Sequence, residues 1–213
     1  MVERFPVRIA GEPMELLGDR ALYWPARQRL LVADLHLGKG NIFRAAGIPV
    51  PTGGTAHDLQ RLQLLLAETG AQSLWVLGDF LHGRRHISVD QAWATFREAH
   101  SAVDMAVVVG NHDRSLDAEA AGVEVLRDGI CDGPFEFRHD PAESSRGHVV
   151  CGHVHPVIRL EGMGRWPLFW LGERQTVLPA FSAFTGGHAL TRSQAAGSVA
   201  CNGQLMVRLP LRE

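Results

Sequence analysis

Four apolar runs of this chain each end in a short polar string, and this repeated arrangement constrains the fold more than any other feature. The strings are Asp34-Leu35-His36, Gly78-Asp79, Gly110-Asn111-His112-Asp113 and Gly152-His153-Val154-His155. Short apolar runs bounded by turn signals are typical of buried strands. Because each string begins where its run ends, we expect all four sets of polar side chains to emerge at one edge of a buried sheet.

Helical signals alternate with the first runs. Residues 55–69 are predicted as a helix, with a capping box from Thr55 to Asp58 and Gly70 as its stop, and Ser88 with Gln91 marks a second helix to Ser101. A Gly/Pro-rich loop is expected between Gly38 and Gly54, as one wall of a substrate cleft. Strands alternating with helices predict a layered α/β domain whose first half is parallel.

The part after Asp113 is predicted to be mostly β structure. Strands are expected at 14–17, 21–24, 30–33, 74–77 and 105–109, then at 123–126, 134–138, 148–151, 168–171, 175–178, 198–201 and 205–209. Asn202-Gly203 predicts a hairpin turn, because both residues tolerate positive φ. Two packed sheets with helices outside accommodate both halves.

Composition limits the class of protein. A chain of 213 residues with 46% hydrophobic residues is expected to form one domain, residues 1–213. The net charge of −2 argues against a long nucleic-acid track gripped by many phosphate contacts. Three cysteines without CxxC spacing favour a reducing cytoplasm over a disulfide framework. We find no signal-like or membrane-spanning apolar run, and therefore expect no membrane association.

The residue types in the strings suit two divalent metal ions. Mn²⁺, Fe²⁺ and Zn²⁺ accept mixed carboxylate, imidazole and amide ligands. Since residues i and i+2 of a strand share a face, Asp34 and His36 are expected to hold one ion, and the same reasoning joins His153 to His155 if their backbone is extended. Asp79 can bridge two ions, and Asn111 offers a carbonyl oxygen to the second.

Two ions about 3.5–4 Å apart can stabilise an in-line displacement at phosphorus. Phosphate ester hydrolysis is the matching reaction. His112 follows Asn111 directly, so we expect it to donate a proton to the leaving oxygen rather than to bind the same ion. Asp113 is expected to orient the His112 imidazole.

The strings resemble the calcineurin-like metallophosphoesterase superfamily, whose pattern is DxH, GD, GNH(D/E), a lone His and GHxH. The resemblance implies a four-layer α/β/β/α sandwich of two mixed sheets flanked by helices. It also implies a catalytic role for His112 and two sets of ligands. These are Asp34, His36, Asp79 and His155 for metal one, and Asp79, Asn111, His139 and His153 for metal two.

His139 and His148 both lie in the interval permitted for the lone histidine. We favour His139, because it ends a predicted strand as the other ligands do. His148 instead begins the strand that leads to His153, about 15 Å away from that residue along the strand.

Other stretches resemble the PdeM-like group of bacterial ligase-associated DNA-repair endonucleases. They are Leu22–Pro25, Ala33–Asn41, Phe43-Arg44 with Gly47 and Pro49, Leu77–Arg84 and Leu178–Gly187. This resemblance implies a manganese-favouring phosphodiesterase that nicks single-stranded or damaged DNA. Members of the group are encoded beside a helicase, an ATP-dependent ligase and an exonuclease, which are therefore the implied partners.

Three further residues are candidate substrate contacts. Lys39 and Arg44 follow the first ligand string, where each is either a phosphate contact or an ordinary solvated charge. His82 lies three residues beyond Asp79 and either approaches the substrate or makes a loop hydrogen bond.

Two other functions compete with a DNA endonuclease. The same metals cleave many esters, so a phosphatase or pyrophosphatase acting on a nucleotide or another small phosphorylated compound is the first alternative. A non-catalytic interaction scaffold is the second, and the presence of His112 beside a full set of ligands argues against it. The sequence leaves the oligomeric state open.

Overall fold

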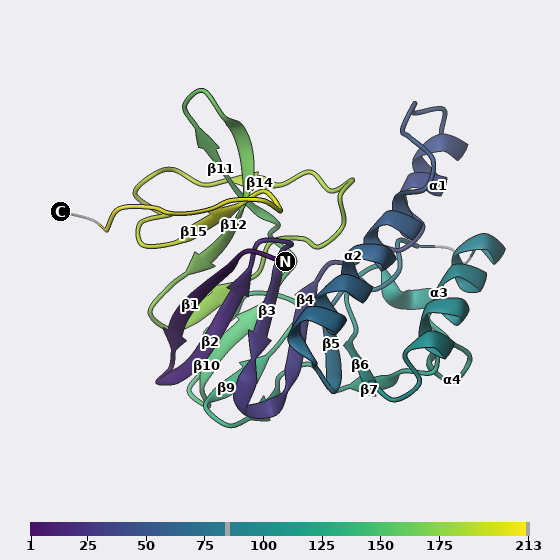
Figure 1. Cartoon of the computed structure of the whole chain (residues 1–213), viewed down its shortest axis with the longest axis horizontal. Helices are drawn as coiled ribbons and strands as arrows, with labels where there is room; N and C mark the ends of the chain where they lie inside the picture. Colours follow the sequence, from purple (N-terminus) through teal and green to yellow (C-terminus); the bar gives the residue numbers. More distant parts are fainter. Residues whose placement is uncertain (84–85, 212–213) are drawn as a thin grey trace.

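The N-terminal apolar runs form one seven-stranded sheet. In this computed structural model, which describes residues 1–83 and 86–211, the strand order is β1-β2-β3-β4-β5-β6-β7 (Figure 1). The bounds are Arg4–Ile9, Glu12–Leu17, Ala21–Trp24, Arg29–Ala33, Ser73–Leu77, Asp104–Val108 and Glu124–Leu126. Strands β1 to β4 pair antiparallel and β4 to β7 pair parallel. The carboxyl ends of β4, β5 and β6 therefore lie at one edge.

The α-helices of the described residues lie beside this first sheet. They are α1 (Lys39–Ala45), α2 (Gly54–Thr69), α3 (Ile87–Ala99) and α4 (Ala118–Ala121), with 3-10 turns η1 (Pro25–Arg27) and η2 (Asp113–Ser115). Helix α2 buries Leu59, Leu62 and Leu66 at helical spacing, in one core cluster with side chains of β4, β5 and β6. These helices form the right-hand layer in Figure 1.

The second sheet contains nine strands and packs against the first. Its main path is β14-β11-β12-β13-β10-β9-β8, and β15 and β16 join it through β12. The bounds are β8 Ile130–Asp132, β9 Phe135–Phe137, β10 His148–Cys151, β11 Pro156–Leu160, β12 Gly164–Leu171, β13 Gln175–Val177, β14 His188–Ala189, β15 Val199–Cys201 and β16 Met206–Arg208. Phe135, Phe137 and Phe169 from this sheet share a core cluster with Leu31 and Ala106 of the first.

The expected α/β sandwich of two mixed sheets with flanking helices is confirmed, with one difference. Every α-helix in the described part of the chain falls between Lys39 and Ala121, so the expected outer helical layer on the second sheet is not formed by these residues. Instead, Trp170 packs against Val149, Cys151 and Val177 in a small separate cluster.

Local signals in the helical part were partly wrong. The expected loop 38–54 contains α1. Helix α2 begins after Gly53, whose backbone is left-handed, and no side chain caps the helix. The hydroxyl of Thr55 instead accepts a hydrogen bond from the Gly38 backbone N–H. Helix α3 likewise has no side-chain cap. The predicted stop at Gly70 is confirmed, since Gly70 has a φ of 64°.

The predicted strands are present, but β1, β8, β11 and β14 were not expected. The predicted hairpin joins β15 to β16, with positive φ at Gly203 alone, because the Asn202 carboxamide accepts from the N–H groups of Gln204 and Leu205. A search of the described helices finds none whose length and hydropathy would let it span a bilayer.

Candidate metal centre

The polar strings meet beyond the ends of the strands, in tightly hydrogen-bonded loops. The loop after β4 is joined to the loop after β5, because the N–H groups of Asp34 and His36 donate to the carbonyls of Gly78 and Asp79 at 3.2 and 2.7 Å. Asp34 and His36 have φ values of 54° and 46°. The two side chains therefore converge from a left-handed backbone, and the expectation of an extended one was wrong.

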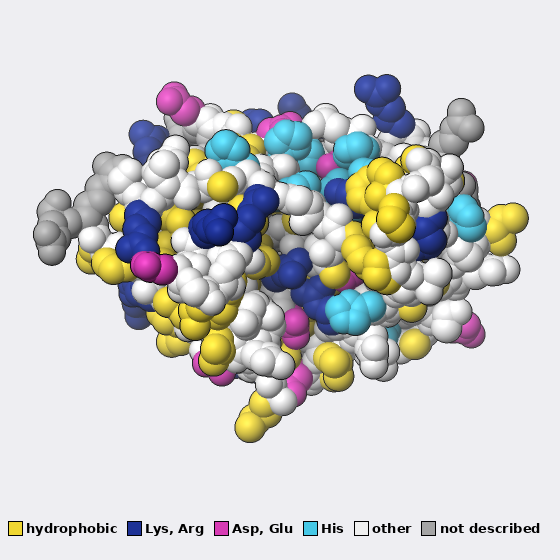
Figure 2. Space-filling model, turned by 90° about the horizontal axis from the view of Figure 1, so that it is seen from above, with side chains coloured by type: hydrophobic (Ala, Val, Ile, Leu, Met, Phe, Trp, Pro, Cys, Tyr) yellow, Lys and Arg dark blue, Asp and Glu magenta, His cyan; other side chains and the backbone are white. Residues whose placement is uncertain are grey.

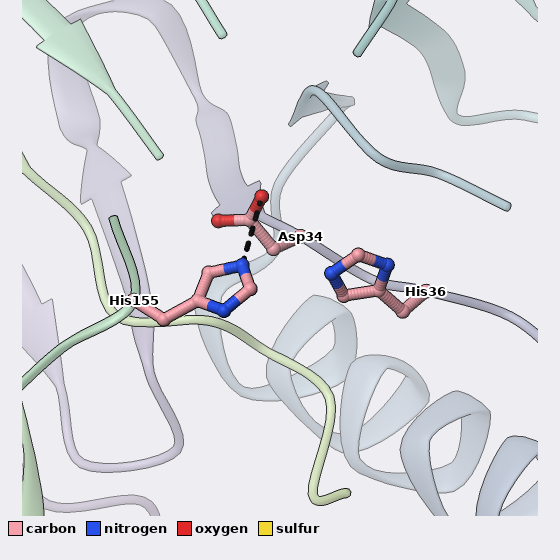
Figure 3. A group of neighbouring side chains, drawn as sticks. All are labelled: Asp34, His36 and His155. Atoms are coloured by element: carbon pink, nitrogen blue, oxygen red, sulfur yellow. Dashed lines mark ion pairs between the residues drawn. The ribbon is translucent and has the colours of Figure 1, made fainter. Parts of the chain in front are cut away.

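The first ligand group consists of Asp34, His36 and His155. One ligand atom of each lies within 4.8 Å of the others. Figure 3 shows the three side chains turned toward one another, and His155 Nε2 lies 3.4 Å from Asp34 Oδ1. Asp34 is fully buried, whereas the His155 side chain is 18% exposed.

The second ligand group consists of Asp79, His139 and His153, whose ligand atoms again lie within 4.8 Å of one another. His139 Nε2 is 3.7 Å from Asp79 Oδ1 and 2.9 Å from His153 Nδ1. His153 and His155 have φ values of 65° and 51° and belong to different groups. The spacing argument that joined them was wrong, and the division implied by the family pattern matches the structure.

Asp79 belongs to the second group but lies close to the first as well. Its Oδ2 is 3.7 Å from His36 Nε2, and its Oδ1 is 3.7 Å from His139 Nε2. The backbone N–H of His112 donates to Oδ1 at 3.0 Å. One carboxylate oxygen thus faces each group, which is the arrangement that a bridging ligand needs.

Unpartnered polar atoms gather at this centre. Within the described residues, five buried side-chain atoms have no hydrogen-bond partner: Asp34 Oδ1, His36 Nε2, His139 Nδ1, His155 Nε2 and Thr185 Oγ1. An unsatisfied buried polar group costs about 1–3 kcal/mol. The first four belong to the ligand groups, so the residues present fit divalent cations.

Electrostatics favours the neutral imidazole that a metal requires. Burial, with neighbouring Lys39 and His155, lowers the pKa of His36 to about 2. His82 Nδ1 lies 3.1 Å from His36 Nδ1, which leaves His36 Nε2 directed at Asp79. Metal-ligating histidines commonly use their second nitrogen in this way.

Two glycines of the strings make room for ligands of other strings. A Cβ at Gly78 would lie 1.8 Å from His139 Nδ1, and a Cβ at Gly152 would lie 2.5 Å from Asp34 Oδ2. The glycines are therefore required by the close approach of the ligands.

The structure brings His139, and not His148, to the centre. His148 is buried in β10, and its Nε2 lies 2.9 Å from the hydroxyl of Thr176. Phe135 contacts the same ring edge-on, with the centroids 6.2 Å apart. His148 is thus a core residue with its own partner.

His112 and Asn111 are exposed beside the ligand groups. The His112 side chain is 46% exposed, and its Nε2 lies 4.0 Å from Asp79 Oδ2. Its ring stacks on that of His82, with centroids 4.7 Å apart and an interplanar angle of 24°. This is a position from which an imidazole can reach a substrate bound at the centre.

Asp113 does not orient His112, so that expectation was wrong. Its buried carboxylate accepts hydrogen bonds from the backbone N–H groups of Phe80, Leu81 and Gly110, at 3.2, 2.8 and 2.8 Å. Burial nevertheless raises the pKa of this carboxyl. Asp113 therefore joins the loop that follows Asp79 to the loop that contains Asn111 and His112.

The three candidate substrate contacts differ in their burial and in their hydrogen-bond partners. Lys39 begins α1 and is buried; burial lowers the pKa of its ammonium, while Asp34 and Asp79 oppose that shift. Arg44 instead donates to the Pro51 carbonyl at 2.8 Å and to Asn41, which closes its own loop. Burial, with Lys39 and His112, lowers the pKa of His82 to about 4.

Sequence reasoning missed the residues that support the ligands from behind. The Asp128 carboxylate accepts the His139 backbone N–H at 3.1 Å. Arg20 and Arg61 donate to the carbonyls of Ser182 and Phe181, at 3.0 and 2.8 Å, and the N–H of Ser182 donates to the carbonyl of Asp34. These residues carry no motif, and only the tertiary contacts reveal them.

The chain matches a family model and is similar to solved structures. The family model described as calcineurin-like phosphoesterase matches residues 29–155. The crystal structure of Pseudomonas putida nuclease MPE is 37% identical, with a TM-score of 0.83, and the match covers 93% of this chain and 96% of that one. The protein of unknown function AQ665 from Aquifex aeolicus is 18% identical over 60% of this chain and 78% of its own, with a TM-score of 0.43. No curated protein matches the chain.

Proposed function

This chain belongs to the calcineurin-like phosphoesterase family and is a metal-dependent phosphate ester hydrolase, and from that premise we propose that it is a phosphodiesterase that cleaves single-stranded or damaged DNA. The observation that carries the proposal is the Asp79 carboxylate, with one oxygen toward each ligand group. The similar protein from Pseudomonas putida is a nuclease by name, which supports a nucleic-acid substrate. We further propose a role in DNA repair, alongside a helicase, a ligase and an exonuclease.

We assign the ligands in two sets that share Asp79. Asp34, His36 and His155 complete the first set, and Asn111, His139 and His153 complete the second. The donor atoms are carboxylate and amide oxygens and imidazole nitrogens, which suit Mn²⁺ and leave Fe²⁺ and Zn²⁺ as alternatives. When bound, such a pair of ions supplies Lewis-acid charge to the phosphoryl oxygens and acidifies the attacking water.

The remaining chemistry falls to the protein's own residues. His112 is exposed and adjacent to Asp79, so we assign it the transfer of a proton to the leaving oxygen. His82 stacks on the His112 ring and limits its rotation. Lys39 contributes positive charge close to Asp34 and Asp79. Asp113 acts indirectly, by holding the backbone of both loops.

The test compares three substrates with the purified protein and Mn²⁺. We expect cleavage of a single-stranded oligonucleotide and of bis-p-nitrophenyl phosphate, and slow hydrolysis of p-nitrophenyl phosphate. His112→Gln is expected to lower kcat by about 10²–10⁴-fold, the usual contribution of general acid–base catalysis. The matched control is His57→Gln, because the His57 side chain is 60% exposed.

Three outcomes would contradict the proposal. A strong preference for the monoester or for a nucleotide would make the protein a phosphatase or pyrophosphatase. Activity of the His112 variant equal to that of the control would remove His112 from the reaction. A wild-type protein that binds no Mn²⁺ under replete conditions would be a scaffold.

A further inference from the structure

Charge is distributed unevenly along this chain. Residues 156–213 contain six arginines and three glutamates, with no lysine or aspartate, which gives a net charge of +3. Residues 1–155 carry a net charge of −5. Such an asymmetry is a sign of an anionic partner, and it is hidden in the overall value of −2.

Two of these arginines lie directly opposite each other in the hairpin formed by β11 and β12. Arg159 of β11 and Arg165 of β12 are cross-strand partners, and both are exposed. Like charges directly opposite destabilise a sheet. Within residues 1–83 and 86–211, neither guanidinium forms an ion pair. The pair therefore costs stability when the protein is alone.

The hairpin is attached directly to the first ligand group. Strand β11 begins at the residue after His155, and β14 is joined to it by a hydrogen bond from the His188 N–H to the His155 carbonyl. Arg165 donates to the carbonyl of Gly187 at 2.6 Å. A Cβ on Gly187 would lie 2.5 Å from the His155 carbonyl oxygen, so the backbone at Gly187 packs against this ligand.

The two arginines thus lead outward from the metal centre. Arg165 donates a hydrogen bond to the Gly187 segment, which packs on His155. Arg159 lies four residues beyond His155, about 13 Å along the strand. In Figure 2, Lys and Arg side chains lie on the left, just below the group of His side chains, and others lie near the centre and at the upper right. The β11–β12 hairpin rises on the left in Figure 1 as well.

We propose that Arg159 and Arg165 bind backbone phosphates of the nucleic-acid strand on one side of the scissile phosphate. This inference rests on the proposed function and extends it, because it identifies which surface guides the strand. Guanidinium groups bind phosphate oxygens through paired N–H donors. A small diester carries one phosphate and cannot occupy the metal centre and the arginine pair at once. The pair therefore favours a polymeric substrate.

The experiment uses the double variant Arg159→Ser with Arg165→Ser. We expect kcat/KM for a single-stranded oligonucleotide to fall by at least tenfold, with no more than a twofold change for bis-p-nitrophenyl phosphate. For oligonucleotide affinity, each lost contact should reduce the slope of log affinity against log salt by about 0.7, the value for single strands. The double lysine variant should keep the wild-type slope, because it keeps the charges.

The matched control is Arg8→Ser. Arg8 is also an exposed strand arginine that donates to a glycine carbonyl, that of Gly11, but it lies in β1, at the edge of the other sheet. The Arg8→Ser variant should leave the slope of log affinity against log salt unchanged.

Three outcomes would overturn the inference. An unchanged salt slope in the double variant is the first, and an equal loss toward both substrates, which would indicate damage to the metal centre, is the second. If the wild-type protein cleaves the aryl diester but no DNA, the proposed nuclease function fails. In that case equal oligonucleotide affinity of wild-type and variant, measured by fluorescence anisotropy, would overturn the arginine surface as well.

Discussion

The two ligand groups have the same kinds of donor atoms but differ in their access to solvent. Asp34 and His36 are buried with exposed side-chain fractions of 0% and 2%, and His155 reaches 18%. In the second group Asp79 and His139 are buried, but the His153 side chain is 43% exposed, and Asn111, which we assign beside this group, is exposed as well. An ion bound by the first group would thus be held by the core of the protein, and one bound by the second would face the solvent.

This difference indicates that the two groups have different roles, one in ion binding and the other in contact with substrate. A buried, preorganised group loses little entropy when it binds an ion, so the first group should bind its ion more tightly. The second group adjoins His112 and the open surface, where substrate must arrive.

The largest effect is expected from Asp79, which both groups share. Asp79→Asn removes charge from both sets of ligands, so kcat should fall by at least about a thousandfold, since several kcal/mol of charge stabilisation are lost. Steady-state cleavage of bis-p-nitrophenyl phosphate measures the change. Activity within tenfold of wild type would mean that the two groups work independently.

Replacing one ligand of a single group should have a smaller effect, which differs between the two groups. Asp34→Asn should abolish the tighter of two Mn²⁺ binding events in a calorimetric titration. His153→Asn should weaken only the looser event, by at least the 10–100-fold that is typical of changes around a metal site. If the His153 variant loses the tighter ion instead, solvent exposure does not decide affinity here.

Removal of the ions should lower stability moderately. With Mn²⁺ at about 100 times its Kd, a site that exists only in the folded state adds about 2.7 kcal/mol, or roughly 5–10 °C in Tm for a chain of this length. Thermal unfolding with and without a chelator tests this. The Asp34 variant should lose most of the shift and the His153 variant least, and the reverse order would contradict the comparison.

The smallest effect is expected at His148. His148→Gln preserves a polar group near Thr176, so the free energy of unfolding should fall by only about 1 kcal/mol, the net value of one hydrogen bond. Both Mn²⁺ affinities should remain unchanged. A loss of metal binding in this variant would return His148 to the list of candidate ligands.

The ligands and the strands that lead to them could be foreseen from the sequence. The strands that deliver the ligands are short apolar runs, so β4, β5, β6 and β10 follow from residue type alone. The ligands are polar residues at the ends of these runs, and their spacing matched a known pattern. Local periodicity and chemistry are sufficient for both.

The backbone between the ligands could not be foreseen. Asp34 and His36 adopt positive φ because their N–H groups bond to a loop more than 40 residues away in the sequence. The alternation rule for strands therefore does not apply to them. Strand β11 was missed for a related reason: it begins with Pro156, and it forms because it pairs with β12 and β14. Such pairings depend on tertiary contacts, which a local pattern does not contain.

Five of the assigned ligands, Asp34, His36, Asp79, His153 and His155, have the positive φ that glycine adopts most easily. Each such position costs on the order of 1–3 kcal/mol for a residue with a side chain. Selection for stability and selection for catalysis therefore act in opposite directions at these five positions. A descendant of this protein that no longer needed the reaction could gain stability by accepting glycine there. In such a descendant, the loss of activity would be accompanied by a rise in thermal stability.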